Sequence, residues 1–103
     1  MDSYGVVWQQ NNRPPVAGKL ELDPSRLRLE GNDRSELAVY ALPFRDLIGV
    51  RVGRESRDRL DGRPTLLLER SNGDTLRIAS LQHGVVCEIA ERLATLETGP
   101  RAA

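Results

Sequence analysis

Two hydrophobic periodicities divide this chain of 103 residues into unequal parts, and that division constrains the fold more than any other feature. From residue 4 to about 79, apolar residues alternate with polar ones in short runs separated by turn signals, as in strands with one buried face. From about 84 to 97 the apolar residues recur at helical spacing instead. The sequence therefore predicts a mainly β domain that ends in one helix.

Two hairpins are marked by their turns. In the first, Leu20 and Leu22 alternate with charged residues before Asp-Pro-Ser, and Leu27 and Leu29 alternate with charged residues after it. In the second, Asn72-Gly73 separates two strand-like runs, and both residue types tolerate positive φ. With the remaining runs, seven strands are expected at about residues 4–9, 17–22, 26–30, 37–42, 48–53, 65–70 and 75–79.

The closing helix carries one apolar stripe, and Gly99-Pro100 is a typical stop signal after it. The stripe consists of Val86, Ile89, Ala90, Leu93 and Leu96. Seven short strands fold into a β-sandwich or a partly open barrel, and a helix with one apolar stripe can cover the open end. The expected fold is a seven-stranded antiparallel sandwich or barrel capped by a C-terminal helix, forming one domain over residues 1–98 with an irregular tail at 99–103.

Composition narrows the possible functions. The 15 basic and 15 acidic residues balance, so no overall field attracts nucleic acid, and none is expected as a partner. The single cysteine, Cys87, excludes an internal disulfide or a cysteine zinc site, and its place beside the stripe predicts a small buried residue. The N-terminus lacks the features of a signal peptide, and no window has the roughly 20 apolar residues of a spanning helix, so a cytoplasmic protein is expected.

Enzyme chemistry has little support in the sequence. His83 is the only histidine, and no cluster of carboxylates accompanies it as metal ligands. A pairing of His83 with Cys87 lacks a third group to orient it, and no glycine-rich phosphate loop is present. We therefore expect a non-enzymatic protein with no cofactor, no metal and no catalytic residue.

The whole pattern resembles the pleckstrin-homology (PH) superfold, and more narrowly the small bacterial PH-like and GRAM-like domains. The resemblance rests on the hairpin of leucine pairs at 20–22 and 27–29, the stretch LPFRDLIGVRV at 42–52, the Asn72-Gly73 hairpin and the closing helix. The tryptophan usual in eukaryotic PH helices is missing, and the only tryptophan, Trp8, lies in the first strand. The resemblance implies a binding scaffold for phosphoinositides, peptides or other proteins.

A phosphoinositide site of the PH kind does not fit the sequence well. Lys19 and the Arg26-x-Arg28 pair match the basic motif literally, but they fall one strand too late along the chain. The three loops that form the ligand rim in such domains, QQNNRPP, GNDRSE and SNGD, together hold two arginines against three acids. A phosphate site needs several converging cations or backbone donors.

The charged stretch RESRDRLDGRP at 54–64 is the other candidate site. Its arginines, with Arg51 before it, would contact an acidic partner or anionic headgroups, although three acids nearly cancel them and a solvated hairpin loop explains the charges as well. Tyr40 and Phe44, near a sheet corner, are core residues or, if exposed, part of a docking surface. The candidate partner surface is Arg51, Arg54, Arg57, Arg59, Arg63, Tyr40 and Phe44.

These observations favour an interaction module that binds a protein partner or a second copy of itself. The alternative is weak binding of anionic lipid headgroups or phosphates through the arginine-rich loop, with peripheral contact to an anionic membrane.

Overall fold

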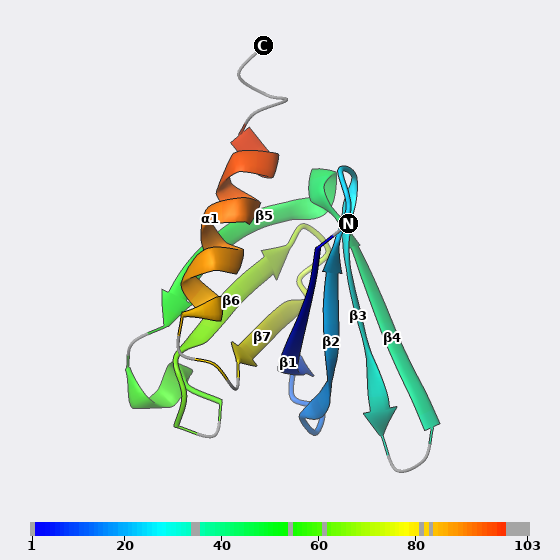
Figure 1. The fold of residues 1–103 in the computed structure, drawn as a ribbon, viewed down its shortest axis with the longest axis vertical. Coiled ribbons are helices and arrows are strands. Elements are labelled where there is room, and N and C mark those ends of the chain that lie inside the picture. The colour runs from blue at the N-terminus through cyan, green and yellow to red at the C-terminus, as the bar shows by residue number, and fades with distance from the viewer. Residues whose placement is uncertain are drawn as a thin grey trace.

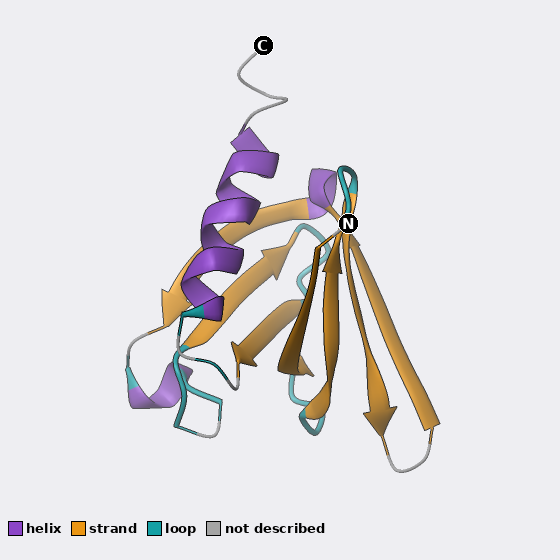
Figure 2. Ribbon diagram, in the orientation of Figure 1, coloured by secondary structure: helices purple, strands orange, loops and turns teal. Residues whose placement is uncertain are grey.

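A computed structural model describes residues 2–33, 36–53, 55–60, 62–80, 82 and 84–98. Figures 1 and 2 show strands through most of the chain and one long helix at its end, as the sequence predicts. The strands are β1 (Asp2–Gln10), β2 (Val16–Leu22), β3 (Arg26–Asp33), β4 (Glu36–Pro43), β5 (Leu47–Gly53), β6 (Thr65–Arg70) and β7 (Thr75–Ser80), and the helix is α1 (Val85–Thr98). Short 3-10 turns, η1 (Phe44–Asp46) and η2 (Ser56–Asp58), precede and follow β5. The expected tail at 99–103 lies outside the described residues.

The seven strands form one antiparallel sheet with the order β4-β3-β2-β1-β7-β6-β5. Strand β1 joins its two halves, because it pairs with β2 on one side and with β7 on the other, where Val6 lies opposite Ser80. The sheet curls into a half-barrel, with β1–β4 on one side and β5–β7 beneath the helix (Figure 1). The end strands of the sheet are β4 and β5.

The core fills the concave side of the sheet, and α1 covers it against β5, β6, β7 and η1. The predicted apolar stripe faces this core, since Val86, Ile89 and Leu93 are fully buried. The prediction for Cys87 is wrong: its side chain is exposed, because a residue one position after Val86 is rotated about 100° around the helix axis. Among the described helices, none has the length and apolar composition needed to cross a bilayer.

The hairpin between β6 and β7 forms where the Asn72-Gly73 pair predicts it. Its turn is not the two-residue type in which both of these residues have a positive φ. Of the two residues, only Gly73 has a positive φ, at 97°. The Gly73 amide donates to the Arg70 carbonyl at 2.9 Å, and the Arg70 amide donates to the Asp74 carbonyl at 2.9 Å. This is the longer type of hairpin loop, in which one glycine in the left-handed region follows a type I turn.

Two glycines allow β2 and β3 to approach closely where the sheet curls. Gly18 lies opposite Gly31 in the ladder. A Cβ added to Gly18 would lie 1.8 Å from the Glu30 carbonyl oxygen, and one added to Gly31 would lie 2.5 Å from the Ala17 carbonyl oxygen. Nearby, the buried indole of Trp8 donates its N–H to the same Glu30 carbonyl at 3.3 Å. A side chain at either position would therefore displace the backbone of the neighbouring strand.

We predict that Gly18→Ala lowers the free energy of unfolding by about 1–3 kcal/mol, because the neighbouring backbone must shift to admit the methyl group. Gly5→Ala is the matched control, since a Cβ at this strand position meets nothing within 4 Å. We expect that control to leave the free energy of unfolding unchanged or to raise it by up to about 1 kcal/mol. Urea denaturation followed by circular dichroism measures both, and equal effects would show that the close approach is not a constraint.

Candidate functional site

The predicted arginine loop is held against the sheet by one leucine. Leu60 is only 7% exposed, although it lies in a run of charged residues and outside the main core cluster. Its amide donates to the Thr65 Oγ1 at 2.8 Å, and the Thr65 hydroxyl donates to the Arg63 carbonyl at 2.9 Å. A single bridge between Leu60 and Arg63 closes the turn. The loop is therefore attached to the first residue of β6 by the two hydrogen bonds of Thr65, and Leu60 is buried beside them.

The arginines of this region are distributed along the chain segment. Arg51 is an exposed residue of β5, Arg57 lies in η2, and Arg59 and Arg63 are exposed on either side of Leu60. The Arg57 side chain is 82% exposed and its Nε lies 2.8 Å from a carboxylate oxygen of Glu55, so this pair contributes little to stability. Arg54 lies outside the described residues.

The two aromatic candidates do not belong to the surface. Tyr40 and Phe44 are each 7% exposed and are part of the core cluster. Tyr40 points inward because the inward residues of β4 are Ala38, Tyr40 and Leu42, and Phe44 is buried in η1, which packs against α1. The hypothesis that they form part of a docking surface is therefore wrong.

Tyr40 instead belongs to a network of polar side chains. Its hydroxyl donates to the Asp74 Oδ2 at 2.7 Å, and Arg70 Nη1 donates to the Tyr40 oxygen at 3.1 Å. Arg70 Nη2 donates to the Asp46 Oδ2 at 3.0 Å. These contacts join β4, η1, β6 and the β6–β7 turn, and so they hold the end strand β4 against the far half of the sheet.

Asp74 lies in the SNGD loop, one of the three loops where the resemblance noted in the sequence would place a ligand rim. The hydrogen bond from Tyr40, followed by one from Asn11 Nδ2 at 3.2 Å, holds the pKa of the Asp74 carboxyl below its usual value, while burial raises the pKa of the Tyr40 hydroxyl. Asn11 lies in the β1–β2 turn, so this anion lies where two of the three rim loops meet. Of the two rim arginines, Arg34 lies outside the described residues and Arg13 is exposed. A carboxylate that stays ionised at this place opposes an anionic ligand.

The outer edge of β4 offers backbone groups without a sheet partner. In an antiparallel ladder, alternate residues direct their N–H and C=O groups to the same neighbour. Two bonds fix the alternation: the Asp23 amide donates to the Arg26 carbonyl at 3.1 Å, and the Phe44 amide donates to the Ser25 carbonyl at 3.0 Å. With Asp33 opposite Glu36 in the register, the even-numbered residues of β4 bond to β3. Leu37, Val39 and Ala41 therefore direct their backbone groups away from the sheet, and no other described strand pairs with this edge.

The side chains along this edge are apolar and exposed. Leu37 is 69% exposed and Val39 is 48% exposed, and Ala41 follows them on the same outer face. The neighbouring strands differ, because their outer face carries charges that pair with one another: Lys19 with Glu21 and Glu30 at 3.3 and 3.1 Å, and Arg28 with the same two carboxylates at 3.5 and 2.6 Å. We call residues Leu37, Val39 and Ala41 the β4 edge.

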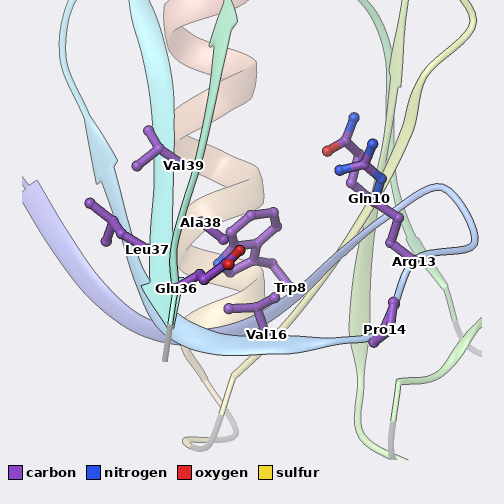
Figure 3. A pocket seen from close by; sticks show the side chains of 9 residues that line it. All are labelled: Trp8, Gln10, Arg13, Pro14, Val16, Glu36, Leu37, Ala38 and Val39. Atoms are coloured by element: carbon purple, nitrogen blue, oxygen red, sulfur yellow. The ribbon is translucent and has the colours of Figure 1, made fainter. Parts of the chain in front are cut away.

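A hollow of about 310 Å³ lies beside the β4 edge, at the end of the half-barrel between β4 and the β1–β2 loop. Figure 3 shows Trp8, Val16 and Ala38 at its centre, with Gln10, Arg13 and Pro14 on one side and Leu37 and Val39 on the other. Glu36 and Arg13 place one charge of each sign at this hollow. The edge and the hollow together form a surface on which an extended chain could lie.

The overall structure has close counterparts among solved structures. No protein-family model matches the chain, and no curated protein matches it in sequence. The C-terminal domain of an unknown protein from Leishmania infantum superposes with a TM-score of 0.68 at 13% identity over 94% of this chain and 81% of that one. The PH domain of USP37 superposes with a TM-score of 0.59 at 10% identity over 94% of this chain and 95% of that domain. The chain has a PH-like fold.

A structure of Vav1 with an allosteric inhibitor, described as one that blocks its GEF activity, matches with a TM-score of 0.69 at 10% identity. The match covers 94% of this chain and 26% of Vav1, so this PH-like chain corresponds to about a quarter of that larger protein. At these identities the three likenesses concern the fold alone.

The residues of the β4 edge were missed by the sequence reasoning, which predicted the strand but not its position. The signal that could have indicated the edge is the run LAVYAL, in which the outward positions carry no charge, whereas β2 and β3 of this PH-like sheet carry a charge at nearly every outward position. Among the described residues, no group of three or more histidine, cysteine, aspartate or glutamate side chains could hold a metal ion.

We predict that Leu60→Ala detaches the arginine loop. Removing the buried side chain should lower the free energy of unfolding by about 2 kcal/mol and accelerate tryptic cleavage after Arg57 and Arg59. Ile48→Ala is the matched control, because Ile48 is exposed and lies outside the β4 edge, and it should change the free energy of unfolding by less than about 0.5 kcal/mol. Identical cleavage rates in both variants would show that Leu60 does not anchor the loop.

We predict that Tyr40→Phe lowers the free energy of unfolding by about 1 kcal/mol at neutral pH, because it removes the hydroxyl that contacts Asp74 and Arg70. The folded-state pKa of Asp74 is lowered, so its contribution is present above the ordinary carboxyl pKa of 3.8 and is lost as the pH falls through the folded value. The difference in the free energy of unfolding between the wild-type protein and the variant should therefore become smaller below about pH 4. Urea midpoints measured from neutral to acidic pH test this, and a constant deficit would contradict it.

Proposed function

We propose that this protein is a non-enzymatic binding module that accepts an extended polypeptide strand along the β4 edge. One observation carries the proposal: Leu37, Val39 and Ala41 present unpaired backbone groups together with exposed apolar side chains, and no charged residue interrupts them. Strand addition of this kind obtains affinity from main-chain hydrogen bonds and specificity from pockets for alternate side chains.

The hollow beside the edge supplies a place for such a side chain. Its lining is more polar than apolar, because Gln10 accompanies the largely buried Trp8 and Val16, so a side chain of the added strand that can form hydrogen bonds fits best there. Arg13 and Glu36 lie at the same hollow and would select polar groups at the ends of the bound segment. The PH-like fold supports this role because domains of this kind serve as binding scaffolds.

We further propose that residues 1–98 act as one such domain in the cytoplasm, and that it belongs with the small bacterial PH-like and GRAM-like domains. The position of its only tryptophan supports this placement: Trp8 is buried in β1, and α1 has none.

A second candidate function is weak binding of anionic headgroups by the loop arginines. The observation that favours it is the buried Leu60, whose described neighbours Arg57, Arg59 and Arg63 are all exposed. The paired Glu55 and the near balance of charge weaken it.

Selection of a displayed random-heptapeptide library on the immobilised protein tests the first proposal. We expect the selected peptides to alternate apolar with other residues, and Val39→Lys to weaken their binding by about tenfold or more, because it places a charge against the added strand. Ile48→Lys is the matched control, since Ile48 is a 63% exposed residue on the opposite end strand β5. Binding that survives Val39→Lys and disappears with Ile48→Lys would contradict the proposal.

Binding to lipid vesicles distinguishes strand binding at the β4 edge from headgroup binding by the loop arginines. Co-sedimentation with vesicles containing about one fifth anionic lipid should fail for the wild-type protein if strand binding is its function. Co-sedimentation that is lost when Arg57, Arg59 and Arg63 are changed to serine would favour the headgroup function instead.

A further inference from the structure

We propose that the strand bound at the β4 edge is the β4 edge of a second copy of this chain, paired antiparallel about a twofold axis at Val39. This inference rests on the proposed function and names its partner. It depends on three properties of the edge: its hydrogen-bonding pattern, the sizes of its side chains and the charges around it.

The hydrogen-bonding pattern is self-complementary. Leu37, Val39 and Ala41 are the residues whose N–H and C=O groups point away from β3. An antiparallel pair centred on Val39 places Leu37 of each copy opposite Ala41 of the other and Val39 opposite Val39. Each of these three residue pairs can exchange two N–H···O bonds, so every outward backbone group of the edge is satisfied. Pro43, which has no N–H to donate, ends the run of free donors.

The side chains fit the same register. On the outer face the large Leu37 lies opposite the small Ala41 on both sides of the axis, and two β-branched valines meet at the centre. β-Branched pairs directly across an antiparallel ladder are among the favourable cross-strand contacts. The pairing removes from water the two largest exposed apolar side chains of β4, Leu37 and Val39.

No charged residue opposes the pairing along the length of the two strands. Between Glu36 and Pro43 the strand has no charged residue. The register places Glu36 opposite Leu42 of the second copy, so the two glutamates lie at opposite ends of the pair, about 20 Å apart along the strands. The neighbouring charges on β2 and β3 already form ion pairs within one copy, and the chain has no net charge, so two copies do not repel one another.

The other end of the sheet does not offer such an edge. Strand β5 has an irregular register between Leu47 and Gly49, its exposed residues include the cation Arg51, and α1 packs against it. Bulges, charges and covering elements are the usual ways in which proteins protect an edge from pairing. The β4 edge has none of these devices along residues 37–41.

Sedimentation velocity over roughly two decades of protein concentration tests the inference on the full chain. We expect the wild-type protein to approach twice the monomer mass at the high end. Val39→Pro should weaken association by about tenfold or more, because the Val39 N–H points outward and proline removes only this donor and no bond to β3. Val39→Lys should do the same through its charge, and Ile48→Lys should leave association unchanged. Circular dichroism confirms that each variant is folded.

Chemical cross-linking tests whether the contact between two copies lies at Val39 of β4. We would replace the exposed Cys87 by serine and introduce Val39→Cys or, as the control, Ile48→Cys. A short bis-maleimide should join two copies through position 39, because these residues face one another at the axis. It should not join them through position 48.

The outcomes separate this inference from the function on which it rests. A protein that stays monomeric at every concentration, while peptide binding remains sensitive to Val39→Lys, overturns the second copy as partner and leaves strand binding intact. Dimers that persist in both Val39→Pro and Val39→Lys also overturn it. Loss of both self-association and peptide selection in the wild-type protein rejects the inference and the proposed function together.

Discussion

The contact between Tyr40 and Asp74 determines how the two ends of the sheet relate to one another. Strands β4 and β5 end the sheet and do not pair, so backbone hydrogen bonds cannot close the half-barrel. The Tyr40 hydroxyl and the Arg70 guanidinium, whose carbon lies 5.7 Å from the Tyr40 ring centroid, replace them with side-chain contacts across the open side. These contacts lie on the inner face of β4, whereas its outer edge has no described strand partner because β4 is the last strand of the sheet. The candidate site therefore depends on a network that lies behind it.

The sequence predicted every strand and the helix because alternation, turn residues and helical spacing are local properties. The order of the strands is not a local property. Strand β1 pairs with β7 across 74 residues, from Val6 to Ser80, and the hydrophobic pattern of a strand does not indicate which strand it pairs with. The exposure of Leu37 and Val39 follows from that order, since the same run of residues in a central strand would be covered. The sequence therefore shows that 37–42 is a strand, whereas only the pairing shows that it is an edge.

The errors in predicted burial also have physical causes. Cys87 was placed beside the helical stripe, and a shift of one residue, about 100° around the axis, decides between core and solvent. Tyr40 could be assigned to core or surface, and its partners Arg70 and Asp74 lie 30 and 34 residues away in the chain. Leu60, a single apolar residue among charges, has no periodicity at all, so its burial against the sheet could not be foreseen. The near balance of charge in the loop agrees with the one ion pair described there, between Arg57 and Glu55.

A comparison of the arginine loop with the β4 edge explains why the edge carries the proposed function. Arg57, Arg59 and Arg63 are exposed and the ion pair of Arg57 with Glu55 is solvated, so water already stabilises these charges without a partner. The β4 edge differs, because exposed apolar side chains and unpaired backbone groups along one strand favour association with any available strand. The network behind it keeps the edge extended in the free protein, so little ordering is needed when a partner strand binds. The edge is also short, from Leu37 to Ala41, and its backbone is already extended, so both the length and the register of a strand that pairs with it are limited.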